Sequence, residues 1–199
     1  MKIGIYGGSF NPIHYGHIGL AKWVIENTNL EEVWMMISPN NPLKDKSILA
    51  DEQERLAAAK EAIGDGLLGN KTMRQESEET KGRIIVSDFE FHLPRPTYTA
   101  NTLRALAKEY PEHEFTLIIG EDNLRIFDQW REYQYILDNY RVFVYPRKSE
   151  NEKVKGEKLE AKEIIYLAGA PYFDISSTEL RKNLHNWKLF CTFAVEYLT

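Results

Sequence analysis

One stretch decides how this chain folds: residues 2–17, which read Lys-Ile-Gly-Ile-Tyr-Gly-Gly-Ser-Phe-Asn-Pro-Ile-His-Tyr-Gly-His. An apolar run ends in the pair Gly7-Gly8, and apolar residues at helical spacing follow the last histidine. We therefore expect a short buried strand that turns through glycine into a helix whose first turn carries His14 and His17. Free backbone N–H groups and the positive end of a helix dipole favour anions at such a place. The stretch predicts a phosphate-binding loop.

Downstream, apolar runs typical of buried strands alternate with amphipathic segments typical of helices. The predicted strands are Ile3–Tyr6, Val33–Ile37, Ile84–Val86, Phe115–Ile119, Val142–Tyr145 and Ile164–Leu167. The predicted helices span 15–28, 52–64, 99–109 and 121–137, and Asp51 is the expected N-cap of the second. This alternation predicts an α/β fold, a doubly wound Rossmann-like parallel sheet flanked by helices. Ligands of such sheets bind beyond the carboxyl ends of the strands, where the opening loop would lie.

The length of 199 residues suits one domain, and we find no internal repeat or linker that would divide residues 1–199. A small C-terminal helical part is expected at about 176–199. The segments 65–82 and 147–162 are polar, charged and without period. We interpret both as solvated loops without a catalytic role, although long loops also serve as lids.

Composition narrows the class of protein. The formal net charge of −5 argues against a nucleic-acid-binding surface, which is normally basic. No apolar run approaches the roughly 20 residues that span a bilayer, so no membrane association is expected. The chain enters a strand directly, and its single cysteine, Cys191, fits a reducing compartment. We therefore expect no signal peptide and a cytoplasmic location.

The opening loop is open to more than one interpretation. It lacks the third glycine of the dinucleotide fingerprint and the Gly-Lys-Ser/Thr of a Walker A loop. His14 and His17 could form half of a zinc site, but neither a nearby cysteine pair nor a second histidine cluster supplies the remaining ligands. They could also be helix-start residues with structural hydrogen bonds only. The glycine turn that precedes them favours phosphate binding.

A second candidate phosphate site lies near the other end of the chain, in Asp174-Ile175-Ser176-Ser177-Thr178-Glu179-Leu180-Arg181. Alone, this string is typical of an ordinary helix N-cap. A helix start with spare hydroxyl groups and an arginine one turn later also suits phosphate. Two such sites in one chain suggest a polyphosphate held between them.

Together the two strings resemble the nucleotidyltransferase superfamily with paired histidines in its first loop and an Ile-Ser-Ser-Thr-x-x-Arg motif. Within it, the chain resembles the bacterial nicotinate-nucleotide adenylyltransferases, and the resemblance covers nearly the whole chain. Similar middle segments are Pro39–Lys44, Arg95–Leu103 and Gly120–Asn123 followed by Trp130. The chain departs from the family pattern at Asn11, where Asp is more frequent, at Pro42-Leu43-Lys44 in place of Pro-Pro-His-Lys, and at Arg131, where an aromatic residue is frequent.

The resemblance implies that the 5′-phosphate of nicotinate mononucleotide attacks the α-phosphorus of ATP directly, giving nicotinate adenine dinucleotide and pyrophosphate in NAD biosynthesis. It implies catalytic roles for His14, His17, Lys44 and Arg181. It places ATP on Gly7, Gly8, Ser9, Phe10, Gly120, Asp122, Ile175, Ser176, Ser177 and Thr178. It places the pyridine nucleotide on Asn40, Lys44, Tyr98, Thr99, Trp130 and Arg131, whose guanidinium could pair with the pyridine carboxylate. No metal ligand is apparent in the protein, so Mg²⁺ is expected to arrive on the ATP phosphates.

Other functions stay open from the sequence. A sister transferase would use nicotinamide mononucleotide, phosphopantetheine or another phosphorylated acceptor, although Trp130 and Arg95–Leu103 argue against it. A class I aminoacyl-tRNA synthetase core shares the paired histidines, but no Lys-Met-Ser-Lys-Ser-like string follows. A non-catalytic nucleotide sensor would bind ATP without turnover. The expected partners are small-molecule substrates, and a homo-oligomer is possible.

Overall fold

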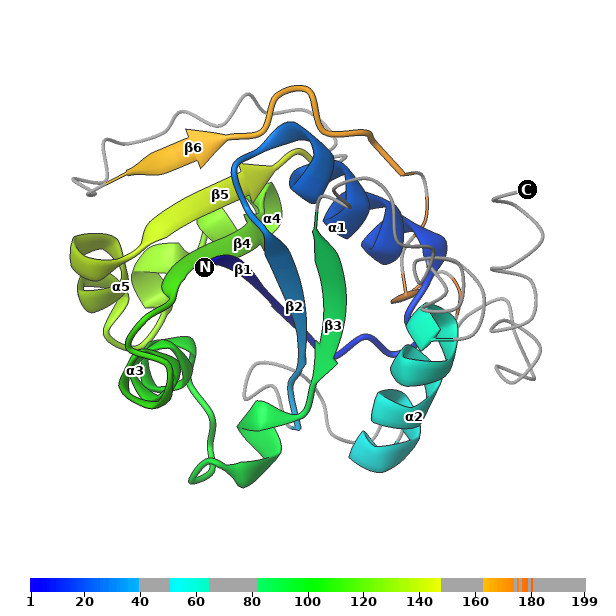
Figure 1. The fold of residues 1–199 in the computed structure, drawn as a ribbon, viewed down its shortest axis with the longest axis horizontal. Coiled ribbons are helices and arrows are strands. Elements are labelled where there is room, and N and C mark those ends of the chain that lie inside the picture. Colours follow the sequence, from blue (N-terminus) through cyan, green and yellow to red (C-terminus); the bar gives the residue numbers. More distant parts are fainter. Residues whose placement is uncertain are drawn as a thin grey trace.

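A single six-stranded sheet forms the centre of the computed structural model, which describes residues 1–39, 51–64, 82–147 and 163–173 together with Ile175, Ser177, Thr178 and Leu180 (Figure 1). The strands are β1 (Lys2–Gly8), β2 (Glu32–Ile37), β3 (Arg83–Ser87), β4 (Glu114–Gly120), β5 (Arg141–Tyr145) and β6 (Ile164–Tyr166). All neighbouring pairs are parallel, in the order β3-β2-β1-β4-β5-β6. The six predicted strands and the doubly wound parallel sheet are thereby confirmed. The winding direction reverses between β1 and β4, which is the topological switch point where such sheets bind ligands.

Three of the four predicted helices are confirmed as α1 (Tyr15–Asn27), α2 (Glu52–Ala62) and α3 (Thr99–Glu109). The predicted cap of α2 is also present, because the Asp51 carboxylate accepts a hydrogen bond of 2.8 Å from the Gln53 backbone N–H. Short 3₁₀ turns occur at η3 (Phe89–His92) and η4 (Phe127–Gln129).

The prediction of one helix over 121–137 is wrong. The segment forms α4 (Glu121–Leu124), η4 and α5 (Tyr133–Asn139), with a break at Trp130 and Glu132. Trp130 is extended, with φ −73° and ψ 139°, and Glu132 is left-handed, with φ 54°. Neither glycine nor proline marks the break. Phe127 and Ile136, on its two sides, are buried in the same core, so the pattern of apolar residues does not reveal the break.

Apolar side chains cover both faces of the sheet, as expected for parallel strands. One core joins α1 and α2 to the face that carries Tyr6, while the other joins α3 and α5 to the face that carries Ile3 and Ile5 (Figure 1). Residues of β1 therefore alternate between the two cores. None of the helices in the described ranges is both long and apolar enough to cross a membrane.

A buried arginine holds the opening loop against the end of β2. The guanidinium of Arg55, on α2, donates hydrogen bonds to the backbone carbonyls of Ser9 at 2.6 Å, Ser38 at 2.9 Å and Pro39 at 3.1 Å. The residue is only 3% exposed. Burying a charged group costs free energy unless it has close hydrogen-bond partners, and the three carbonyls are such partners. Arg55 therefore positions the loop that follows β1.

Candidate active site

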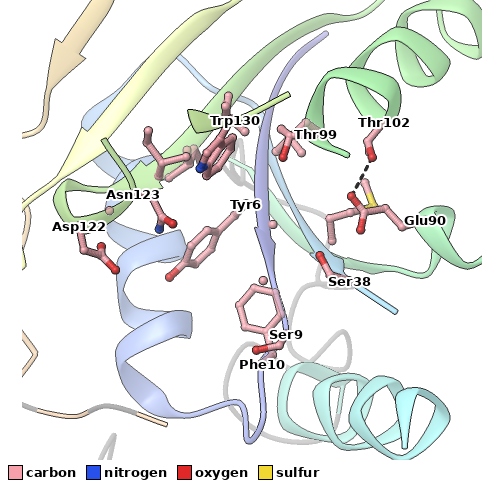
Figure 2. A pocket seen from close by; sticks show the side chains of 18 of the residues that line it. Tyr6, Ser9, Phe10, Ser38, Glu90, Thr99, Thr102, Asp122, Asn123 and Trp130 are labelled. Atoms are coloured by element: carbon pink, nitrogen blue, oxygen red, sulfur yellow. Dashed lines mark hydrogen bonds between the residues drawn. The ribbon is translucent and has the colours of Figure 1, made fainter. Parts of the chain in front are cut away.

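A cavity of about 480 Å³ opens at the carboxyl ends of β1 and β4, at the switch point of the sheet. Its walls come from the loop after β1, the first turns of α1 and α3, and the segments that follow β4 and β5. Figure 2 shows Asp122 on one side of the end of β1 and Thr99 with Glu90 on the other. The cavity therefore has two ends, which we call the Asp122 end and the Thr99 end.

Segments from the two ends of the sequence meet at this cavity. The Ser177 hydroxyl donates a hydrogen bond of 2.9 Å to the Pro12 carbonyl, across a separation of 165 residues. Ser177 and Thr178 line the cavity together with Gly7, Gly8, Ser9 and Phe10. The structure thus brings both candidate phosphate strings to one site.

Glycines of α1 permit this approach. A Cβ placed on Gly16 would lie 2.9 Å from a methyl carbon of Ile175, and one on Gly19 would lie 2.5 Å from the ring of Phe173. A side chain at either position would push the C-terminal segment away from the helix. Ile175 fills this contact and does not itself line the cavity.

The two histidines are stacked at the start of α1, with ring centroids 3.6 Å apart and an interplanar angle of 27°. His17 Nδ1 accepts a hydrogen bond of 3.3 Å from the His14 backbone N–H. A neutral His17 therefore carries its proton on Nε2, which makes that nitrogen a hydrogen-bond donor.

His14 is held in its neutral form. Burial, and then the positive charge of Arg147, lower the pKa of His14 to about 3. Its Nδ1 atom is buried without a hydrogen-bond partner in the described part of the chain. At neutral pH His14 can therefore donate a hydrogen bond to an anion without adding a positive charge.

At the Asp122 end, a polar chain joins β1, α4 and the carboxyl end of β5. Arg147 Nε lies 3.6 Å from a carboxylate oxygen of Asp122, and another guanidinium nitrogen donates to the Tyr145 hydroxyl at 3.2 Å. The Tyr145 hydroxyl lies 3.3 Å from that of Tyr6. Burial would lower the pKa of the Arg147 guanidinium, but Tyr145 and Asp122 raise it above its ordinary value. A Cβ on Gly120 would collide with the Asp122 carboxylate, so a side chain at this position would displace that carboxylate.

At the Thr99 end, α3 begins without a side-chain cap and without an acidic residue in its first turn. The Arg131 guanidinium lies over the ring of Tyr98, the N-cap residue, 4.9 Å from the centroid. Trp130 packs on Phe127, with ring centroids 4.9 Å apart. Tyr98, Thr99, Trp130 and Arg131 all line the cavity.

Glu90 is a buried carboxyl group in the same wall. It accepts a hydrogen bond of 2.8 Å from the Thr102 hydroxyl (Figure 2). Burial raises the pKa of Glu90, while hydrogen bonds from Thr102, Ser38 and Thr97 counteract the increase. The carboxyl group therefore joins the end of β2 to the start of α3.

Comparison with known proteins agrees with this geometry. The family model described as cytidylyltransferase-like matches residues 5–183. Over 188 residues the chain is 41% identical to the probable nicotinate-nucleotide adenylyltransferase of Flavobacterium johnsoniae, covering 94% of this chain and 89% of the relative. The chain belongs to the nicotinate-nucleotide adenylyltransferase family.

A second family member, from Bacteroides fragilis, is 42% identical over 187 residues, which cover 94% of this chain and 84% of the relative. The solved structure of Plasmodium falciparum nicotinic acid mononucleotide adenylyltransferase complexed with NaAD has the same fold. Its TM-score is 0.72 at 20% sequence identity, covering 99% of this chain and 94% of that chain. The nucleotidyltransferase fold and the family resemblance predicted from the sequence are confirmed.

The structure gathers most of the residues singled out by family resemblance. The predicted residues that line the cavity are Gly7, Gly8, Ser9, Phe10, His14, His17, Tyr98, Thr99, Gly120, Asp122, Trp130, Arg131, Ser177 and Thr178. Asn40, Lys44, Ser176 and Arg181 lie outside the described residues, as do most of 65–82, 147–162 and the expected C-terminal helical part. Within the described ranges, no three His, Cys, Asp or Glu side chains group closely enough to hold a metal ion.

Several lining residues are not singled out by the sequence, among them Tyr6, Glu90, Tyr145 and Arg147. Arg147, at the start of the predicted solvated loop 147–162, is exposed as expected, but it also lines the cavity. A basic residue just beyond the carboxyl end of a predicted strand was the available signal. No sequence signal marks Glu90, since its hydroxyl partners come from two separate segments, at Ser38 and at Thr97 and Thr102.

Proposed function

We propose that this chain transfers the adenylyl group of ATP to nicotinate mononucleotide, forming nicotinate adenine dinucleotide and pyrophosphate in NAD biosynthesis. The contact between Ser177 and Pro12 carries the proposal, because it unites both phosphate-binding strings at one cavity. Family membership supports the same reaction, since the curated relatives are named for it.

The reaction needs the acceptor phosphate to be aligned with the α-phosphorus of ATP, and it needs the negative charge that develops on the leaving pyrophosphate to be neutralised. A phosphate monoester has its second pKa near 6, so the acceptor is already mostly dianionic at pH 7 and needs no general base. One of its oxygens forms a bond to the α-phosphorus, while the bond from that phosphorus to the α,β-bridging oxygen breaks. Both electrons of the broken bond leave with pyrophosphate. The main catalytic requirement is stabilisation of this developing negative charge.

We assign that stabilisation first to His17, whose Nδ1 contact makes Nε2 a donor. His14 would be a second, neutral donor. Ser177 and Thr178 would contact phosphate at the cavity rim, and Asp122 would accept hydrogen bonds from the adenosine ribose. Lys44 and Arg181 would supply the cationic contacts, and ATP would enter as its magnesium complex.

The acceptor would lie at the Thr99 end. Trp130 offers an aromatic face for the pyridine ring, and stacking on an aromatic side chain contributes about 1–3 kcal/mol. The backbone N–H groups of Tyr98 and Thr99, at the start of α3, would donate to the pyridine carboxylate.

Turnover of magnesium-ATP with each of three acceptors tests the proposal: nicotinate mononucleotide, nicotinamide mononucleotide and phosphopantetheine. We expect pyrophosphate release to be fastest with the nicotinate compound. Activity with phosphopantetheine alone would indicate a sister transferase, and ATP binding without turnover would indicate a sensor. Either result would overturn the proposal.

A further inference from the structure

We propose that Arg131 is a specificity-determining residue, whose guanidinium recognises the negative charge on the acceptor's pyridine ring and so favours the acid over the amide. The inference rests on the proposed function and refines it.

The first observation is the charge state of the cavity wall. Two arginines line the cavity within the described residues, Arg131 and Arg147. Arg147 lies 3.6 Å from the Asp122 carboxylate, whereas no ion pair involves Arg131 in the described part of the chain. Arg131 instead lies over the Tyr98 ring, 4.9 Å from its centroid, directly after the candidate stacking residue Trp130. Its positive charge is available for an anionic group of a ligand.

The second observation is the backbone that presents Arg131. Glu132 adopts φ 54°, a left-handed conformation that costs a residue with a side chain energy and that occurs often at functional sites. Its carboxylate accepts a hydrogen bond of 2.8 Å from Arg104, on α3. Arg104 also donates to Asn101 at 3.1 Å. Two contacts thus join the turn to α3: Arg131 on Tyr98, and Glu132 with Arg104.

The third step concerns the chemistry of the acceptor. A carboxylate only accepts hydrogen bonds, whereas an amide also presents an NH₂ group that needs an acceptor. The guanidinium and the N–H groups at the start of α3 are all donors. An amide placed among them leaves its NH₂ facing donors, while a carboxylate is matched and its charge is neutralised.

Steady-state kinetics of Arg131→Met test the proposal, because methionine keeps an apolar stem over Tyr98 and removes the charge. We expect kcat/KM for nicotinate mononucleotide to fall about 10- to 100-fold, as for loss of a hydrogen bond to a charged group. The value for nicotinamide mononucleotide and the KM for ATP should stay within about twofold, so that the acid preference falls by the same factor. Arg131→Lys should recover part of the preference, because it restores the charge without the planar fork.

The matched control is Arg125→Met, which removes an exposed arginine outside the cavity and changes the net charge equally. It should leave the preference unchanged. An equal loss with both pyridine nucleotides in Arg131→Met, or no loss with either, would overturn the inference. Failure of the proposed function would look different, because the wild type itself would not use nicotinate mononucleotide.

Glu132→Gly tests whether the turn acts through Arg131. Glycine adopts the left-handed conformation without strain but removes the contact to Arg104. We expect a smaller loss of acid preference than in Arg131→Met, and no further loss when the two substitutions are combined. A loss of equal size in the Arg131→Met background would show that Glu132 acts independently, and would overturn its assignment as a positioning residue.

Discussion

Replacing Arg55 by methionine is expected to destabilise the protein by about 3 kcal/mol, because the substitution leaves three backbone carbonyls without their charged donor. The side chain donates to the carbonyls of Ser9, Ser38 and Pro39 at 2.6–3.1 Å and is almost fully buried. Hydrogen bonds to charged groups contribute about 1.5–3 kcal/mol each, which sets an upper range of about 4.5–9 kcal/mol. Removing the desolvated charge and rehydrating some carbonyls offset part of this loss. Methionine retains the apolar contacts of the stem, so the change isolates the polar contribution.

Urea denaturation measures the effect as a lower midpoint at an unchanged slope. Because Ser9 belongs to the opening loop, we also expect the KM for ATP to rise, and Arg55→Lys to restore part of both properties. Lys60→Met, an exposed substitution on the same helix, should change stability by less than about 0.5 kcal/mol. If Arg55→Met lost less than about 1 kcal/mol and kept its KM, the three carbonyls would not depend on the guanidinium.

Three further predictions concern the cavity itself. His17→Ala should lower kcat by about 10²–10³ with little change in ATP binding, as loss of a transition-state donor does; unchanged turnover would refute the donor role. Trp130→Ala should raise the KM for the pyridine nucleotide more than the KM for ATP, and an equal rise in both would contradict stacking. The pKa of His14 is lowered to about 3 by burial and by Arg147, so between that value and its ordinary value near 6.5 the unfolded chain binds the extra proton. As the pH is lowered from about 6.5 to about 3, the free energy of unfolding should therefore decrease, by up to about 1.4 kcal/mol per pH unit. His14→Gln should lack this component, and superimposable pH profiles of the two proteins would argue against a neutral His14.

The sheet could be predicted from the sequence because its strands obey a simple physical rule. Parallel strands covered on both faces need nearly continuous apolar residues, and runs such as Val33–Ile37 and Phe115–Ile119 show this directly. Their alternation with amphipathic helices then leaves few topologies. The candidate site was harder to predict from the sequence, because the contact of Ser177 with Pro12 spans 165 residues and no local pattern predicts it. Two candidate phosphate strings in one chain suggest the connection, and the family resemblance supports it.

Local sequence patterns do not predict the role of a residue whose partners lie in other segments of the chain. Glu90 is buried, and its hydroxyl partners are Thr97 and Thr102, near the start of α3, and Ser38, directly after β2. Arg147 follows β5 but interacts with Asp122, which follows β4. The break at Glu132 carries no glycine or proline, and an exposed salt bridge joins it to Arg104 on α3. Features that local sequence preferences do not predict lie at or next to the cavity, as expected because functional sites often break local rules.

The charges around the cavity explain how a chain with a net charge of −5 can bind two anionic substrates. Among the described lining residues, the acidic groups Glu90 and Asp122 balance the guanidinium groups of Arg131 and Arg147. Asp122 interacts with Arg147, and hydroxyl groups satisfy Glu90, so Arg131 carries the least compensated charge. We therefore expect phosphate recognition to rely on positioned donors such as the histidine pair, on backbone N–H groups, and on the cations predicted in the remaining segments. Positioned donors of this kind act at short range, so geometry selects the ligand and a long-range field contributes little.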